Sequence, residues 1–289
     1  MKKLQALVAP TALTEQSIDK MLKTIRIPPR PSLLFEVQHE LASDDPSPKK
    51  LAGIIGQDVG MAGALLKLAN SSFVGLRLKA KSVEQAVMRL GMEQCSLLLT
   101  GILAREAVQV KGISLTQFWD SSTKRAQAMS YYAKKMNLCR SDIAHIFGLF
   151  CNIGAPLIMM KFPDYDTVLD AVMKSELWAT TNVEDKYFDT NHAALGSLLA
   201  RTWGLPGEVV EAILLHHYYD VLQDQDTGNV VKNLVALALL VDYGIYRSHS
   251  RKKMNEWEIG GAAVCAYLGI SQAEADDISD EIQQMFDEV

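Results

Sequence analysis

The chain has 289 residues, of which 48% are apolar and 22% charged, which suits one large globular domain or two smaller ones. Its net charge is −5, and no dense block of lysine and arginine is present, so we expect no binding to nucleic acid. Cys95, Cys139, Cys151 and Cys265 are scattered without a CxxC pair. This spacing indicates free thiols in a reducing compartment, and we therefore expect a cytoplasmic protein.

Neither of the two apolar stretches that might meet a membrane has the composition of a span. In residues 1–17 a basic start is followed by an apolar stretch that Gln5 and Pro10 interrupt, so we expect a short N-terminal arm and not a signal peptide. Residues 143–160 carry no formal charge, but they include Asn152 and Pro156. We expect a buried core helix there and no membrane association.

Helical patterning runs through the whole chain. Apolar residues recur at spacings of three and four, and no stretch shows the period-2 alternation of a half-buried strand. Serine and proline signals mark the helix starts. In chain order, the expected starts are Ser32, Ser47 with Pro48, Ser82, Ser141, Pro206 and Ser271. The sequence therefore predicts an all-α fold.

Three loops divide these helices. They are residues 25–31, which are rich in proline, residues 110–114, and the polar residues 219–228. We expect an arm over 1–17, a helical domain over 18–220 whose two halves meet near 110–114, and a helical extension over 221–289 that packs on the second half.

Three places carry residues that are unusual for an apolar helix. His192 shares a helical face with Leu195, Leu199 and Trp203, and a lone histidine in such a place is most often a hydrogen-bonded core residue. Both His216 and His217 follow apolar residues, and because adjacent helical positions diverge by about 100°, the sequence does not decide which one faces inward.

Asp242 lies in the apolar stretch LVALALLVDYGIY. A carboxylate there is costly unless it is paired or binds a metal, although a helix end emerging into solvent would explain it equally well. Two histidines and a carboxylate that meet in a helical core would suit a metal ion.

Several stretches, taken in order, resemble the HDOD domain, the HD-related output domain of bacterial signalling proteins. The resemblance covers roughly residues 20 to 220. The matching stretches are RIPPRPSLL (26–34), IIGQDVGMAGALLKLANSSF (54–73), SVEQAVMRLG (82–91), GLFCNIG (148–154), NHAALG (191–196), WGLP (203–206) and the histidine pair 216–217.

The resemblance implies an HD-like helical fold related to the HD and HD-GYP phosphohydrolases, in which histidines and aspartates gather a metal. It places the early histidine of those enzymes at Ser121, or at Asp120 if the register differs by one. The His-Asp pair falls on Cys151-Asn152, and the lysine that follows it falls on Ala155. The resemblance places the later histidines at His192 and at His216 or His217, and the late aspartate at Asp242.

These departures predict a degenerate pocket. Asn152 cannot supply the charge of an aspartate, and Ser121 is a poor ligand, although a Cys151 thiolate could bind zinc. The remaining histidines and Asp242 could instead satisfy one another by hydrogen bonds, and no metal or other cofactor is then expected. If an ion of zinc, manganese or iron is held, its ligands would come from Cys151, His192, His216, His217 and Asp242.

The leading hypothesis is thus a non-catalytic regulatory domain for signal transduction that binds a signalling protein or a small anionic ligand. The alternative is a residual metal-dependent phosphohydrolase. The sequence leaves the oligomeric state open.

Overall fold

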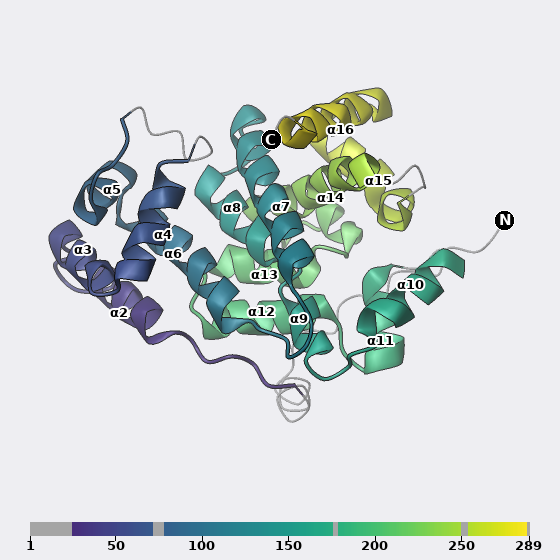
Figure 1. Cartoon of the computed structure of the whole chain (residues 1–289). Helices are drawn as coiled ribbons and strands as arrows, with labels where there is room; N and C mark the ends of the chain where they lie inside the picture. Colours follow the sequence, from purple (N-terminus) through teal and green to yellow (C-terminus); the bar gives the residue numbers. More distant parts are fainter. Residues whose placement is uncertain (1–24, 72–77, 176–178, 250–253, 288–289) are drawn as a thin grey trace. The chain divides into compact units, whose positions relative to one another are not determined.

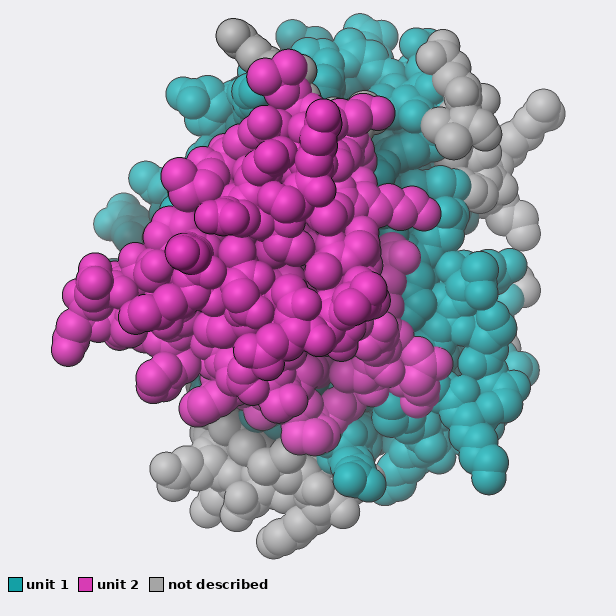
Figure 2. Space-filling model, turned by 60° about the vertical axis from the view of Figure 1, so that its left-hand side comes forward, with its two compact units in different colours: residues 1–27, 110–201, 205–289 teal, residues 28–109, 202–204 magenta. Residues whose placement is uncertain are grey.

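A computed structural model describes residues 25–71, 78–175, 179–249 and 254–287. These residues form helices joined by short loops, and no β-strand occurs among them (Figure 1). The all-α prediction is confirmed. The expected N-terminal arm over 1–17 lies outside the described residues. The chain divides into two compact units, coloured separately in Figure 2: residues 28–109 with 202–204, and residues 1–27, 110–201 and 205–289.

The smaller unit consists of five helices and a short piece of chain from residues 202–204. The helices are α2 (Ser32–Leu41), α3 (Pro48–Gly56), α4 (Val59–Ala69), α5 (Val83–Leu90) and α6 (Met92–Ala107). Trp203 is fully buried in this unit, where its indole N–H donates to the Pro28 carbonyl and its own carbonyl accepts from the Gln38 amide. Proline-rich residues 28–31 are thereby fixed against this unit by hydrogen bonds.

Local signals explain where several of these helices begin. The Ser47 hydroxyl accepts from the Lys50 N–H with Pro48 as the first helical residue, and the Ser82 hydroxyl accepts from the Gln85 N–H. These two predicted caps are confirmed. In contrast, α2 begins at Ser32 itself, after Pro31, and no side chain caps it.

The larger unit holds the remaining helices. They are α7 (Thr116–Lys135), α8 (Ser141–Phe150), α9 (Gly154–Met159), α10 (Tyr165–Ser175), α11 (Thr180–Phe188), α12 (His192–Thr202), α13 (Gly207–Leu215), the 3₁₀ helix η1 (Tyr219–Gln223), α14 (Asn229–His249), α15 (Asn255–Leu268) and α16 (Gln272–Asp287). Helix α7 packs along α8 and α14, and α14 also packs on α13, α15 and α16. Helices α14–α16, which form the expected C-terminal extension, are therefore part of this unit's core. The polar loop expected over 219–228 begins with η1 instead, because Tyr219 is buried.

The uncharged stretch 143–160 forms two helices, α8 and α9, with a turn over 151–153, so the expected single helix is wrong. Pro156 lies in the first turn of α9, where its missing N–H costs no hydrogen bond. Two segments, Ser141–Met159 and Asn229–Arg247, are long and apolar enough to cross a membrane by length and composition. Their most apolar windows are 83% and 56% buried inside the protein, as in core helices.

Candidate functional site

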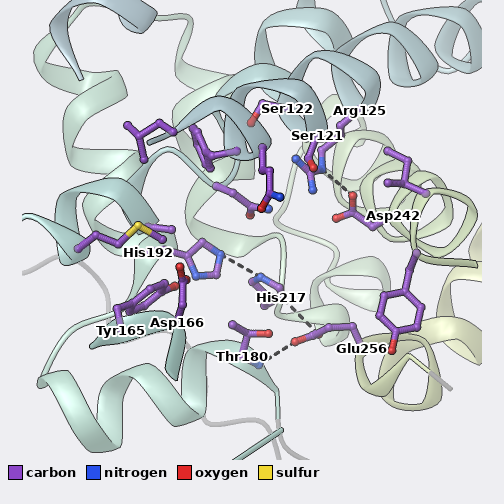
Figure 3. Close-up of a pocket in the computed structure, with 18 of the residues that line it drawn as sticks. Ser121, Ser122, Arg125, Tyr165, Asp166, Thr180, His192, His217, Asp242 and Glu256 are labelled. Atoms are coloured by element: carbon purple, nitrogen blue, oxygen red, sulfur yellow. Dashed lines mark hydrogen bonds and ion pairs between the residues drawn. The ribbon is translucent and has the colours of Figure 1, made fainter. Parts of the chain in front are cut away.

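The larger unit contains a cavity of about 500 Å³. Helices α7, α9, α10, α12, α14 and α15 all contribute to its wall, so it gathers residues that are more than 130 positions apart in the sequence. The polar side chains that line it, ten of which are labelled in Figure 3, are those of Ser114, Gln117, Ser121, Ser122, Arg125, Asn152, Tyr165, Asp166, Thr180, His192, His217, Asp242, Tyr246 and Glu256.

Three histidines meet at one point of this wall. Nε2 of His192 lies 3.1 Å from Nε2 of His216 and 3.0 Å from Nε2 of His217. His192 begins α12, whereas His216 and His217 directly follow α13. His192 and His217 line the cavity, and His216 is buried beside them. The sequence could not choose between His216 and His217, and the structure brings both to His192.

Glu184 fixes the orientation of the first histidine. Its carboxylate, which is fully buried on α11, lies 2.7 Å from Nδ1 of His192 and accepts the backbone N–H of the same residue at 2.9 Å. The hydroxyl of Tyr165 also donates to this carboxylate. Because three donors converge on Glu184, the Nδ1 atom of His192 carries the proton.

The other two histidines have acceptors of their own. Nδ1 of His216 lies 2.7 Å from the carbonyl oxygen of Ile213, which can only accept, so this nitrogen is also protonated. Nδ1 of His217 lies 3.1 Å from Oε2 of Glu256, an ion-pair contact that is poorly aligned for a hydrogen bond. Burial lowers the pKa of His216 well below its usual value, and the nearby His217 and His192 lower it further. His216 is therefore neutral at pH 7.

Glu256 connects His217 to two other parts of the unit. It accepts from the Thr180 N–H at the start of α11 and from the Tyr219 hydroxyl of η1, both at 2.8 Å. Burial raises the pKa of Glu256, but His217 and these donors more than offset it and lower the value to about 2. For His217, burial lowers the pKa, but the charge of Glu256 outweighs burial and the pKa is raised overall. Glu256 is thus an ionised carboxylate in the wall of the cavity.

Asp242 is paired with an arginine. Nε of Arg125 donates to Oδ1 of Asp242 at 2.5 Å, and both side chains line the cavity. The expected hydrogen bond between this aspartate and the histidines is wrong: Nδ1 of His192 and of His217 faces Glu184 and Glu256. A partly buried guanidinium is the stronger partner for the carboxylate because the pair is charged on both sides.

The remaining expected site residues take different positions. Ser121 lines the cavity, as does Ala155, whereas the alternative Asp120 points to solvent and pairs with Lys124. Oδ1 of Asn152 lies 3.1 Å from Nε2 of His216.

Cys151, expected as a possible zinc ligand, is fully buried and its thiol donates to the Gly148 carbonyl. Burial raises its pKa to about 12. Among the described residues, the side chains whose ligand atoms lie within 4.8 Å of one another are the three histidines, and neither Cys151 nor Asp242 joins them.

Sequence reasoning missed Glu184, Glu256 and Arg125. Glu184 lies in the polar stretch TTNVEDKYF and Arg125 in SSTKRAQ, where charges usually face water. Glu256 is in the first turn of α15, where an acidic residue favours the helix dipole without any further partner. For Glu184, the signal in the sequence was that His192 begins a helix shortly after the polar stretch that contains this glutamate.

The three histidines fit a metal ion, and they stand where the resemblance places the later histidines of the HD enzymes, whereas Ser121, Cys151 and Asn152 replace other ligands. Three imidazoles suit zinc, iron, nickel and copper, whereas manganese and magnesium favour oxygen. The fit is that of one ion, because Asn152 is neutral and Asp242 is held by Arg125.

Comparison with known proteins gives a consistent result. A family model described as HDOD domain matches residues 27–219. A protein of Treponema pallidum without an assigned function is 28% identical over 201 residues, which make up 66% of this chain and 37% of that protein.

Two solved structures share the fold at low identity. A candidate phosphohydrolase from Shewanella amazonensis has a TM-score of 0.67 at 20% identity, over 94% of this chain and 93% of that one. A candidate signal transduction protein from Marinobacter aquaeolei has a TM-score of 0.64 at 21% identity, over 92% of this chain and 58% of that one.

Proposed function

Because the chain belongs to the HDOD domain family, we propose that it is a cytoplasmic signal-transduction domain that does not hydrolyse phosphoesters. Either a small ligand binds in its cavity or a signalling protein binds to its surface. The domain then transmits the signal through contacts with its partner protein. The candidate signal transduction protein from Marinobacter aquaeolei, which shares the fold, supports a role in signalling.

The observation that carries the proposal is the state of the two carboxylate positions. A hydrolytic metal site needs ligands that hold the ion, an open coordination position and a bound water whose pKa falls to about 7. Here the aspartate of the His-Asp pair is replaced by Asn152, and Asp242 is neutralised by Arg125. With no free carboxylate on these two positions, a second metal ion lacks two of its usual ligands.

The size of the cavity supports a small molecule as the ligand. Its volume of about 500 Å³ is typical of pockets for small molecules. Its charged lining consists of Arg125 against Asp166, Asp242 and Glu256, an acidic balance. An anionic ligand would therefore bind only if a cation at the histidines offsets these carboxylates. Hydroxyl and amide groups of Ser121, Thr180 and Asn152 would then complete its hydrogen bonds.

A turnover assay tests the proposal. The purified full chain is incubated with cyclic dinucleotides and a chromogenic phosphodiester, with added manganese, iron or zinc. We expect no turnover above a blank that contains the metal alone. Turnover that disappears on His192→Ala and on chelation would establish the alternative.

That alternative, a residual metal-dependent phosphohydrolase, is favoured by one specific observation: the three Nε2 atoms already converge. A single ion there could activate water without Asp242. The phosphohydrolase candidate that shares the fold points the same way.

A further inference from the structure

An arginine and an aspartate present unused hydrogen-bonding groups side by side in the wall of the cavity. Nε of Arg125 donates to Oδ1 of Asp242, and among the described residues this is the one hydrogen bond that either side chain makes. An arginine carries five N–H groups, so the four on its Nη atoms lack an acceptor, and Oδ2 of Asp242 lacks a donor. These atoms are not sealed within the core. They therefore open into the cavity that both residues line (Figure 3).

Such groups call for a partner. The Arg125 side chain is 10% exposed and that of Asp242 20%, so both lie mostly out of bulk water. Buried donors and acceptors in folded proteins are nearly always satisfied by protein, by ordered water or by a ligand. A guanidinium is planar and its donors form a fixed fork, and here a carboxylate holds that fork in place. The pair is therefore a rigid element that is suited to recognise a ligand.

We infer that Arg125 and Asp242 together bind the edge of an amide group on a small neutral ligand. The carbonyl oxygen of the ligand accepts from the Nη atoms, and the N–H beside that carbonyl donates to Oδ2. Carboxamides, lactams and ureas all carry such an acceptor and donor side by side in one plane. The inference rests on the proposed function in one respect, namely that the cavity takes a small ligand.

The charges around the cavity favour a neutral ligand over a charged one. Arg125 and Asp242 compensate each other, so neither an anion nor a cation meets an uncompensated opposite charge at the pair. Glu256 is already contacted by His217 and by two hydrogen-bond donors, and Asp166 is exposed to solvent. A charged ligand would lose hydration without a free counter-charge beside it, which is costly.

Apolar side chains continue from the pair along both of its helices. On α7, Phe118 precedes Arg125 by about two turns and lies on the same helical face. On α14, Ile245 and Tyr246 follow Asp242 at the spacings of three and four that also share a face. These side chains line the same cavity, and α7 and α14 pack on each other. The ligand that fits this wall carries an apolar or aromatic body next to its amide.

The test compares three probes of nearly the same shape and different charge: para-fluorobenzamide, para-fluorobenzoate and para-fluorobenzamidine. Fluorine NMR follows the binding of each probe to the full chain in a buffer that contains a chelator, so that no metal ion takes part. We expect a Kd on the order of 1 mM for the amide, which suits so small a ligand, and binding at least about 5-fold weaker for both charged probes. A charged probe that binds within that factor, or no binding of the amide at about 10 mM, would overturn the inference.

A double variant assigns the binding to the pair. Arg125→Met/Asp242→Leu removes both charges together and retains apolar volume, so the chain should stay folded. It should bind the amide at least about 10-fold more weakly. The matched control is Asp120→Leu/Lys124→Met, which removes an ion pair of α7 that does not line the cavity and should bind as the wild type does. Unchanged affinity in the folded Arg125→Met/Asp242→Leu variant would refute the inference.

A readout on the wild type locates the binding even if that variant unfolds. The NMR signals of isotope-labelled methionine methyl groups report on their surroundings. Those of Met159 and Met254, which line the cavity, should shift when para-fluorobenzamide is added, whereas that of Met88, which is exposed on α5, should not. Shifts confined to methionines outside the cavity would count against the inference.

The outcome is separate from that of the turnover assay. A chain that neither binds the amide nor hydrolyses phosphoesters contradicts the inference and leaves the proposed function standing. A chain that binds the amide and also shows turnover keeps the inference and removes the proposed function.

Discussion

Glu184 accepts hydrogen bonds from both the backbone N–H and Nδ1 of His192. One carboxylate therefore fixes the first residue of α12 in position and also fixes the tautomer of its side chain. Since Tyr165 donates to the same carboxylate, helices α10, α11 and α12 are joined at this point.

Glu184→Gln should destabilise the fold by about 1–3 kcal/mol, because an amide offers one acceptor oxygen to three converging donors and leaves at least one of them unsatisfied. Urea unfolding measures this. Glu211→Gln is the matched control: Glu211 is an exposed glutamate of α13, and its change should stay within about 0.5 kcal/mol. Equal losses in the two variants would show that the environment of Glu184 is not special.

Asp242→Asn should also destabilise the fold, by about 1–3 kcal/mol, because Arg125 would keep a mostly buried charge without its partner. The double variant Arg125→Met/Asp242→Leu removes both charges and should recover most of the loss. The exposed pair of Lys124 and Asp120 gives the control, and Asp120→Asn should change stability by less than about 1 kcal/mol. A melting curve of Asp242→Asn that matches the wild type would contradict the prediction.

Glu256 should make stability depend on pH in acid. Its pKa is about 2 in the fold against an ordinary 4.5, so its contribution is present above pH 4.5 and is lost as the pH falls toward 2. The full contribution is roughly 3 kcal/mol. His217 acts in the opposite sense: its raised pKa stabilises below pH 6.5, and this part is lost as the pH rises through the folded pKa.

The measurement is urea unfolding of metal-free wild type and Glu256→Gln at several values between pH 2.5 and 6. Other carboxylates titrate in both proteins, so the difference between them isolates Glu256. We expect the two to converge as the pH falls. A difference in unfolding free energy that stays constant across this range would show that the fold does not lower the pKa of Glu256.

Gly154→Ala should disturb the histidine cluster from outside it. A Cβ at Gly154 would overlap the carbonyl oxygen of His192 and lie 2.8 Å from the backbone nitrogen of Gly196, so α9 and α12 would have to separate. We expect a loss of several kcal/mol in stability by overpacking. Gly53→Ala is the control, because a Cβ there meets nothing within 4 Å and should stabilise α3 by up to about 1 kcal/mol. Similar melting temperatures for Gly154→Ala and wild type would refute this account.

Local signals in the sequence located the starts of several helices. A serine that precedes a proline or a glutamine-bearing turn, such as Ser47 or Ser82, fixes a helix start through bonds within three residues. The all-α class followed from such signals and from apolar spacing. The break between α8 and α9 was missed because an apolar run looks the same whether or not the helix is interrupted.

The site depended on distant partners. His192 and the pair after α13 stood out because histidine is unusual on an apolar face. Glu184 and Glu256 did not, since a glutamate in a polar segment looks like a surface residue until its burial is known. Asp242 was noticed for the right reason, its apolar surroundings, but its partner Arg125 lies 117 residues away and no spacing rule connects them.

The wall formed by α14 and α15 bears on how the domain should be delimited. The family match ends at residue 219, yet Asp242 and Glu256 lie beyond it, and Glu256 contacts Tyr219 at that very boundary. A chain shortened at the end of the match would lose one side of the cavity and the acceptor of His217. Relatives compared only within the matched region could therefore share the histidines and still differ in whether those histidines are held in place. The part of the chain that builds this site is therefore longer than the part that the family model matches.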